Sequence, residues 1–201
     1  MDRCFACSVR CKKHVKIDTE QVKVEPKYGG PEYETLAAIG TNTGITDIMA
    51  VCKGNEMLNY LGLDSISAGA TIAWAMEMAE TGRFAAQGLD EESLRFGSPK
   101  SVLDMIEKIA YRQGVGDLLA EGSLRAARII GGDAEKYVVH VKGLEVAMHD
   151  PRAMKDMRDN YPVTPTGGDH TGAGLKRTSV RNTVGLCQFL HYNDAKALEL
   201  L

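Results

Sequence analysis

Apolar residues that recur every three or four positions, in segments that end at glycine, are the feature that most constrains the fold. Apolar residues at this spacing lie on one face of a helix. Glycine commonly follows the last residue of a helix because it adopts the left-handed conformation without steric cost. The pattern predicts a series of helices and a mainly α, multihelical fold. The glycines that end the segments are Gly40, Gly62, Gly82, Gly114 and Gly131.

The expected helices have recognisable ends. Ser98 followed by Pro99 is typical of a helix start, because serine caps the first amides and proline fits the first helical position. In the second helix, Ile45, Ile48, Met49 and Cys52 share one face, which predicts that this face is buried. The expected helices run over about residues 32–39, 45–61, 65–80, 99–113 and 117–130.

Two β segments and an irregular region complete the prediction. Residues 15–25 alternate apolar and polar side chains, which predicts a short β-hairpin arm near the N-terminus. A short strand is expected over Tyr137–Val141. Residues 150–174 are rich in Gly, Pro and Thr, which is typical of a functional loop. We expect two domains, residues 1–140 and 141–201, the second truncated at its C-terminal end.

Composition excludes several function classes. Lys and Arg number 24 against 27 Asp and Glu, so the net charge of −3 gives no general attraction to nucleic acid or to an anionic membrane. The sequence contains neither an apolar run of about 20 residues that would span a bilayer nor a secretory leader. We therefore expect a cytoplasmic protein, in which cysteines serve as metal ligands or buried thiols.

The cysteine spacing points to a metal centre. Cys4, Cys7 and Cys11 form a C-x2-C-x3-C motif, and three thiolates so close in sequence can surround one cubane iron–sulfur cluster. Cys187 is the expected fourth ligand. Cys52 lies on the apolar face of a helix and is expected to be a buried thiol. Enzymes that use S-adenosylmethionine for radical chemistry have the two gaps in the opposite order, which fits this motif poorly.

A zinc site is the alternative interpretation of the same motif. Cys4, Cys7, Cys11 and His14 supply four donors that zinc accepts. Structural zinc sites more often separate two ligand pairs by a dozen or so residues. The spacing therefore favours the cluster over zinc.

Longer stretches of the chain resemble the tungsten-containing aldehyde ferredoxin oxidoreductase family. The resemblance rests on strings in the same order along nearly the whole chain: CFACSVRC, YGGPEYETLAAIGTNTGI, NYLGLDSISAGATIAWAMEMAE, HVKGLEVAMHDPRA and NTVGLCQF. It implies a [4Fe-4S] cluster and a tungsten (or molybdenum) bis-molybdopterin, bound between helical domains and an N-terminal β-rich domain. That pterin-binding domain has no counterpart here, so the chain is expected to be part of a longer or split protein.

Two loops carry the implied pterin contacts. The family patterns D-x-x-G-L-D and D-x-x-G-L-C match two segments, each a glycine turn at a helix end that brings backbone amides close to a ligand. Both begin with Asn where the family has Asp, which removes a charge and adds an NH2 donor. The implied cofactor-binding residues are Asn59, Gly62, Leu63, Asp64, Asn182, Gly185 and Leu186.

The resemblance also implies an acid–base pair, Glu34 in GPEYE and His170 in GGDHT. A glutamate can take a proton from water, and an imidazole can hydrogen-bond a carbonyl oxygen. Without the resemblance, Glu34 would be interpreted as a first-turn glutamate favoured by the helix dipole. His149 in HDPRA is a further candidate to line the site, whereas His140 and His191 are expected to serve packing or surface roles.

The implied activity is oxidation of an aldehyde to a carboxylate, with electrons passed through the cluster to ferredoxin. The alternative is a non-catalytic metal-binding helical module that functions only with a partner carrying the pterin domain. Some family members bridge two subunits through a metal held by E-x-x-H. The matching positions here are Lys53 and Glu56, and the lysine argues against that metal. A homodimer without the bridging metal is compatible with the sequence.

Overall fold

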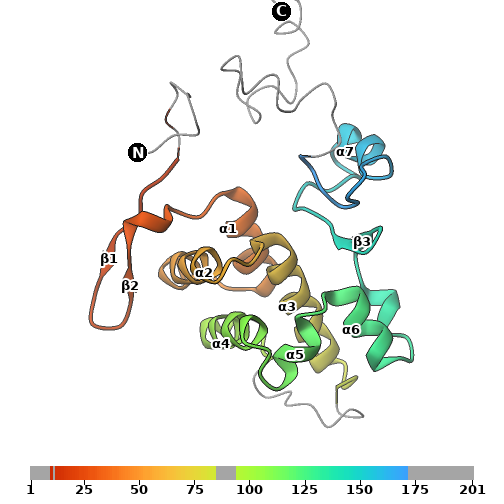
Figure 1. The fold of residues 1–201 in the computed structure, drawn as a ribbon, viewed down its shortest axis with the longest axis horizontal. Helices are drawn as coiled ribbons and strands as arrows, with labels where there is room; N and C mark the ends of the chain where they lie inside the picture. Colours follow the sequence, from red (N-terminus) through yellow and green to blue (C-terminus); the bar gives the residue numbers. More distant parts are fainter. Residues whose placement is uncertain (1–9, 11, 85–93, 172–201) are drawn as a thin grey trace, which may run out of the picture.

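The computed structural model describes residues 10, 12–84 and 94–171, and this part of the chain is mainly α, as predicted (Figure 1). The strands in this part of the chain form two antiparallel hairpins, β1–β2 and β3–β4. The division into domains at residue 140 stays a prediction. The helices are α1 (Tyr33–Ile39), α2 (Ile48–Leu61), α3 (Ser65–Glu80), α4 (Pro99–Ala110), α5 (Val115–Leu119), α6 (Ser123–Ile130) and α7 (Lys155–Asn160), and the strands are β1 (Ile17–Asp18), β2 (Lys23–Val24), β3 (His140–Val141) and β4 (Leu144–Glu145).

Helix α3 lies at the centre of the core. It packs against α1, and α2 packs against α4 (Figure 1). Small residues make the α1–α3 contact close: a Cβ added at Gly69 would lie 2.6 Å from the carbonyl oxygen of Ala38. Ile72, Met76 and Met78 are fully buried, so α3 is closely packed on these sides. This contact fixes the orientation of α1, the helix that carries Glu34.

Several helix ends follow the sequence signals. Gly62 has φ +72° and caps α2 in the left-handed conformation. The side chains of Asp47, Asp64 and Ser98 each accept a hydrogen bond from a first-turn amide, in α2, α3 and α4 respectively. The loop between α2 and α3 is therefore fixed by a glycine at one end and an aspartate at the other.

The single helix expected over residues 117–130 is wrong, because the structure has two helices, α5 and α6, in this region. Gly122 separates them with φ +83°. The carboxylate of Glu145 accepts hydrogen bonds from both the amide and the hydroxyl of Ser123, at 2.8 and 2.6 Å. A distant side chain thus satisfies the start of α6 and makes the break stable.

Other details also differ from the prediction. On α2, Ile48 and Met49 are exposed by 58% and 38%, because the buried side of this helix runs through Ala50, Val51 and Leu58 instead. Cys52 is buried, as predicted, and burial raises the pKa of its thiol. The strand expected from residue 137 begins only at His140, since Ala134–Tyr137 is a 3-10 helix.

The predicted hairpin arm is present as β1 and β2, and two charged residues attach it to α2. Glu56 accepts a hydrogen bond from the Glu25 amide at 2.7 Å and forms an ion pair with Lys53. Lys53 in turn donates to the carbonyl oxygen of Lys23 at 3.1 Å. The two residues at the positions of the E-x-x-H pair thus form an internal ion pair that secures the arm.

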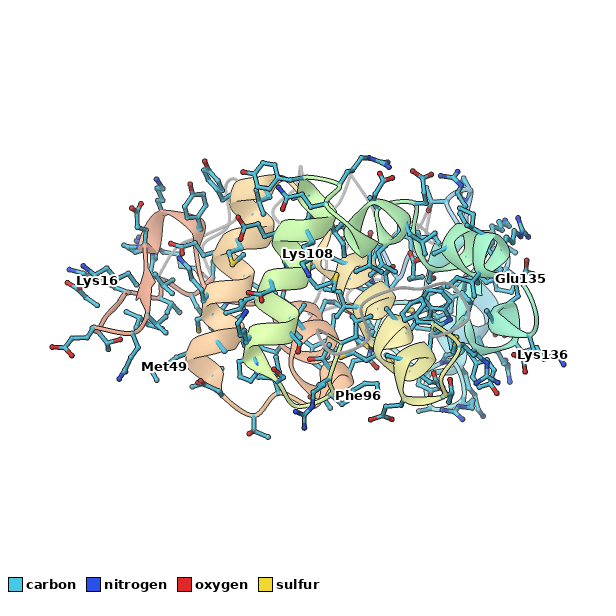
Figure 2. The ribbon with its side chains drawn as sticks, turned by 90° about the horizontal axis from the view of Figure 1, so that it is seen from below. Lys16, Met49, Phe96, Lys108, Glu135 and Lys136 are labelled. Carbon is cyan, nitrogen blue, oxygen red and sulfur yellow. The ribbon has the colours of Figure 1, made fainter. Side chains whose placement is uncertain are left out.

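The surface is charged at both ends of the molecule. Figure 2 shows Lys16 at one end, and Glu135 and Lys136 at the other. Among the described helices, none is both long and apolar enough to cross a membrane.

Candidate functional site

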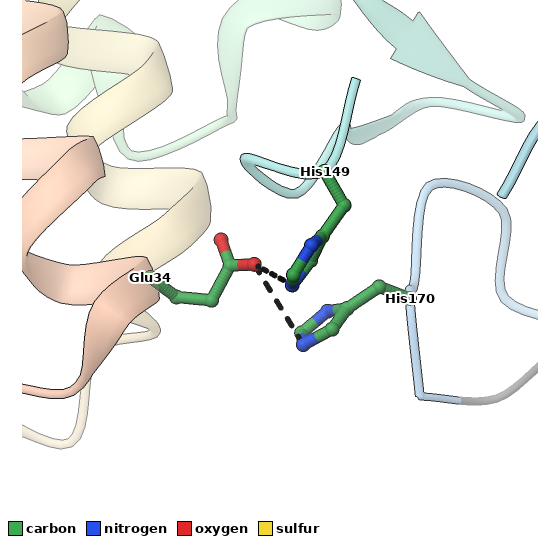
Figure 3. A group of neighbouring side chains, drawn as sticks. All are labelled: Glu34, His149 and His170. Carbon is green, nitrogen blue, oxygen red and sulfur yellow. Dashed lines mark ion pairs between the residues drawn. The ribbon is translucent and has the colours of Figure 1, made fainter. Parts of the chain in front are cut away.

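Three side chains from distant parts of the chain converge on one point. Glu34 projects from the first turn of α1, His149 follows β4, and His170 lies in the loop after α7 (Figure 3). Oε1 of Glu34 lies 3.0 Å from Nε2 of His149 and 3.7 Å from Nε2 of His170. The structure therefore brings the two predicted acid–base residues together and adds a third.

The group is largely shielded from water. The side chains of Glu34 and His170 are 13% and 8% exposed. Among the described residues, Oε1 of Glu34 and Nδ1 of His170 have no hydrogen-bond partner. Buried polar atoms are normally satisfied, so atoms left without a partner are typical of a site for chemistry or binding.

Burial lowers the pKa of His170 below its ordinary value, and it is the largest cause. The charge of Glu34 opposes this effect, whereas a charge on His149 adds to it. Asp169 and Asp64 also favour the protonated imidazole, to a smaller extent. The net effect favours a neutral imidazole, which can both donate and accept a hydrogen bond.

Backbone contacts fix the carboxylate. Oε2 of Glu34 accepts a hydrogen bond from the Met148 amide at 2.8 Å. The neighbouring hydroxyl of Tyr33 donates to the carbonyl oxygen of Met148, also at 2.8 Å. Residue 148 is thus held on both of its backbone groups by the start of α1, which leaves Oε1 directed at the two imidazoles.

Two glycines allow the loop that carries His170 to approach the β3–β4 hairpin. Gly167 has φ +104°, and a Cβ there would overlap the carbonyl oxygen of Val141. A Cβ on Gly168 would lie 2.8 Å from the carbonyl oxygens of Leu144 and Glu145. The Gly-Gly pair before Asp169 is therefore required by packing, and it places His170 beside the chain that carries His149.

The first predicted pterin loop lies next to this group. The hydroxyls of Thr35 and Ser65 are 2.8 Å apart, which links α1 to the start of α3. Around Gly62 a Cβ would meet nothing within 4 Å, so this exposed turn has room for a bulky group. The amide of Asn59 donates back to the Asn55 carbonyl, and Asp64 caps α3. The open space at this turn fits a large cofactor; the direct role of Asn59 stays a prediction.

A pocket of about 720 Å³ adjoins the site. It lies between α1, α3 and the chain around residues 145–152, and Tyr33 and Met148 contribute to both the pocket and the site. Its lining is largely apolar and includes the aromatic side chains of Trp74 and Phe96. Pockets of this size and character are typical of small-molecule sites.

Two groups of residues carry atoms of the kind that bind metals. The ligand atoms of Glu34, His149 and His170 lie within 4.8 Å of one another, and zinc accepts such donors. The short contact between Glu34 and His149 and the backbone bond to Oε2 equally suit a set that shares protons. The predicted cluster ligands Cys4, Cys7, Cys11 and Cys187 lie outside the described residues, as do Asn182, Gly185 and Leu186.

These features define a helical domain in which a shielded carboxylate and imidazole lie beside a glycine turn at a helix end. A family model described as aldehyde ferredoxin oxidoreductase, domains 2 and 3, matches residues 1–198. The chain belongs to this family.

Curated relatives support this family assignment. The tungsten-containing aldehyde ferredoxin oxidoreductases of Thermococcus kodakarensis and Pyrococcus furiosus are each 38% identical over 168 residues, which is 83% of this chain. The WOR-like subunit of the aliphatic sulfonate oxidoreductase of P. furiosus is 34% identical over 177 residues. This chain spans 27% of the length of these relatives.

A solved structure shows the same fold. The active-site complex BamBC of benzoyl coenzyme A reductase, in complex with 1,5-dienoyl-CoA, matches 73% of this chain and 21% of its own. The TM-score is 0.57, at 25% sequence identity. The fold of the helical part is therefore shared by relatives described with different substrates.

Proposed function

We propose that this chain forms the helical side of a tungsten–pterin aldehyde oxidoreductase site, with Glu34 and His170 as its acid–base pair. The observation that carries the proposal is the buried approach of these two side chains, at 3.7 Å, beside the open turn at Gly62. The chain would use ferredoxin as electron acceptor, as the names of the relatives suggest, and we place it in the cytoplasm.

The proposed cofactor contacts come from two helix-end turns. Asn59, Gly62, Leu63 and Asp64 would hold one pterin; Asn182, Gly185 and Leu186 would hold the other. A tungsten–pterin group, when bound, supplies the two-electron oxidation. Cys4, Cys7, Cys11 and Cys187 are the proposed ligands of the [4Fe-4S] cluster.

The described residues have separate tasks in this proposal. Glu34 accepts a proton from water, because Oε1 is directed at the site and Oε2 is already occupied by the Met148 amide. His170, neutral through burial, donates a hydrogen bond to the aldehyde oxygen. The adjoining pocket holds the apolar part of the aldehyde and excludes water from it.

The test compares two neighbouring glutamates in the chain, purified anaerobically from a host that makes the tungsten cofactor. Glu34→Gln should lower aldehyde-dependent reduction of a viologen dye by about 100-fold or more, with the tungsten content retained. Glu32→Gln, at the exposed N-cap position of α1 without a side-chain hydrogen bond, should leave the rate unchanged. Turnover that survives in Glu34→Gln would remove this residue from the mechanism.

A second candidate, a metal-binding module that needs a pterin-carrying partner, is favoured by the 27% coverage of the relatives. It predicts that the chain binds iron and sulfide but shows no tungsten and no turnover until the partner is added. Turnover by the chain alone would exclude it.

The cluster is tested by a matched cysteine pair. Anaerobic protein should contain about four irons with acid-labile sulfide, and Cys187→Ser should lose or convert the cluster. Cys52→Ser should keep it, because Cys52 is buried within α2. Equal losses in both variants would show that Cys187 is not the fourth ligand, and about one zinc without sulfide would assign Cys4, Cys7 and Cys11 to a structural zinc site.

A further inference from the structure

The imidazole of His149 packs against two other aromatic rings, those of His170 and Tyr33. Its ring centroid is 4.8 Å from that of His170, with an interplanar angle of 33°, and 5.3 Å from that of Tyr33, with an angle of 40°. At the same time its Nε2 is 3.0 Å from Oε1 of Glu34 (Figure 3). The imidazole thus contacts both members of the proposed acid–base pair.

The backbone of this segment is held from two sides. Tyr161, just after α7, donates its hydroxyl to the carbonyl oxygen of His149 at 2.9 Å. One residue earlier, Met148 bonds to Tyr33 and Glu34 through its carbonyl and amide groups. Residues so constrained on both sides hold a side chain in one place, which is what precise positioning requires.

We propose that His149 is a positioning residue that holds Oε1 of Glu34 and so prevents this carboxylate from closing a direct ion pair with His170. The inference rests on the proposed function, because it assigns the separation of the acid–base pair to a third side chain. The 3.7 Å distance from Glu34 to His170, against 3.0 Å to His149, is the geometric basis. A closed pair would leave neither group available to water or to an aldehyde oxygen.

The charges around His170 give this role a measurable signature. Three acids face the imidazole: Glu34 from α1, Asp64 from the start of α3, and Asp169 from its own loop. Burial and His149 act against them, and together they keep the pKa of His170 below its ordinary value. If Glu34 were released to approach His170 more closely, the protonated imidazole would be stabilised and this pKa would rise.

The experiment uses two substitutions in the 201-residue chain. His149→Phe keeps the stacked ring but removes the nitrogen that faces Glu34, whereas His149→Gln keeps a nitrogen donor without the ring. The titration of the His170 imidazole is followed by NMR, assigned with His170→Gln. His140 serves as an internal control, because its ring nitrogen accepts a hydrogen bond from the Gly143 amide on the β3–β4 hairpin.

We expect His149→Phe to raise the titration midpoint of His170 by about one pH unit. His149→Gln, which also removes the charge of His149 but keeps a donor to Glu34, should raise it by clearly less. The NMR signals of His140 should keep the same chemical shifts at neutral pH in all three proteins. An unchanged midpoint in His149→Phe, or equal shifts in the Phe and Gln variants, would overturn the proposal. If His149→Phe does not fold, as judged by far-UV circular dichroism, His149→Leu takes its place with the same expectation.

This outcome is separable from that of the proposed function. The titration needs no turnover, so it stands even where Glu34→Gln retains activity and the acid–base assignment fails. In active enzyme, His149→Phe should lower kcat and leave KM nearly unchanged, with rescue by His149→Gln. A change in KM alone would place His149 in substrate binding and contradict a positioning role.

Discussion

Glu145 and Glu34 are both shielded carboxylates in the same part of the molecule, yet their surroundings differ. Oε1 of Glu145 accepts three hydrogen bonds: from the Ser123 amide, the Ser123 hydroxyl and the Thr71 hydroxyl. Glu34 accepts one, from the Met148 amide through Oε2, while its Oε1 faces two imidazole nitrogens. Every hydrogen bond that Glu145 accepts comes from a fixed donor, whereas one oxygen of Glu34 faces titratable groups.

These two environments distinguish a carboxylate that stabilises the fold from one that is suited to proton transfer. Groups that bond to Glu145 belong to rigid helices, so they serve to join α3, α6 and β4. The groups near Oε1 of Glu34 can themselves exchange protons, and this atom has no hydrogen-bond partner among the described residues. A buried carboxylate with one oxygen left to titratable neighbours is suited to proton transfer.

The comparison predicts the largest stability effect at Glu145. Glu145→Ala leaves the Ser123 amide without its acceptor and creates a cavity, so the free energy of unfolding should fall by about 3 kcal/mol. Glu145→Gln keeps a carbonyl acceptor and should lose only about 1 kcal/mol. Urea unfolding followed by circular dichroism measures both. Losses below about 0.5 kcal/mol in both variants would show that this network does not stabilise the fold.

The same contacts show what sequence could and could not predict about the fold. Gly62 and Ser98 act through neighbours in sequence, so the ends of α2 and α4 that they mark were predictable. The break at Gly122 was not, because a glycine inside an apolar pattern is compatible with a continuous helix. The carboxylate that stabilises the break comes from residue 145, which no local signal connects with Ser123.

The candidate site divides in the same way. Glu34 and His170 were named because their surrounding strings resemble a family, and the structure brings them within 3.7 Å of each other. His149 was named only as a residue that could line the site. Its contact with Glu34 depends on two tertiary hydrogen bonds, from the Met148 amide to Glu34 and from the Tyr161 hydroxyl to the carbonyl oxygen of His149. The HDPRA string by itself does not predict these hydrogen bonds. The one local hint was a histidine next to an Asp-Pro turn.

Glu56 offers a second structural acid and a smaller, pH-dependent effect. Burial tends to raise its pKa, but the Lys53 ammonium and the Glu25 amide outweigh it, so the pKa lies below the ordinary value of 4.5. A group with a lowered pKa in the folded state stabilises the protein above its unfolded pKa and loses this contribution as the pH falls through the folded pKa. The stabilisation should therefore be complete at neutral pH and disappear as the pH falls from the ordinary value of 4.5 through the lower pKa of the folded state.

Glu56→Gln tests this contribution. The variant should be less stable than the native chain by about 1 kcal/mol at pH 7, and the difference should vanish as the pH falls through the lowered pKa of Glu56. Urea midpoints measured across this range give the comparison, and Glu20→Gln, on the exposed turn of the arm, is the control. A difference that persists unchanged into acid would assign the effect to packing instead of charge.

The smallest stability effect is expected at Glu34, and it separates the two kinds of acid most sharply. Glu34→Gln keeps a carbonyl oxygen for the Met148 amide and exchanges only the contact of Oε1 with His149 for that of a neutral amide. The free energy of unfolding should therefore change by less than about 1 kcal/mol, as is common where a site residue is not needed for folding. Glu32→Gln provides the matched exposed control in the same urea experiment. A loss of unfolding free energy as large as that of Glu145→Ala would show that Glu34 mainly stabilises the fold. It would contradict the proposed role of Glu34 as the base beside His149 and His170.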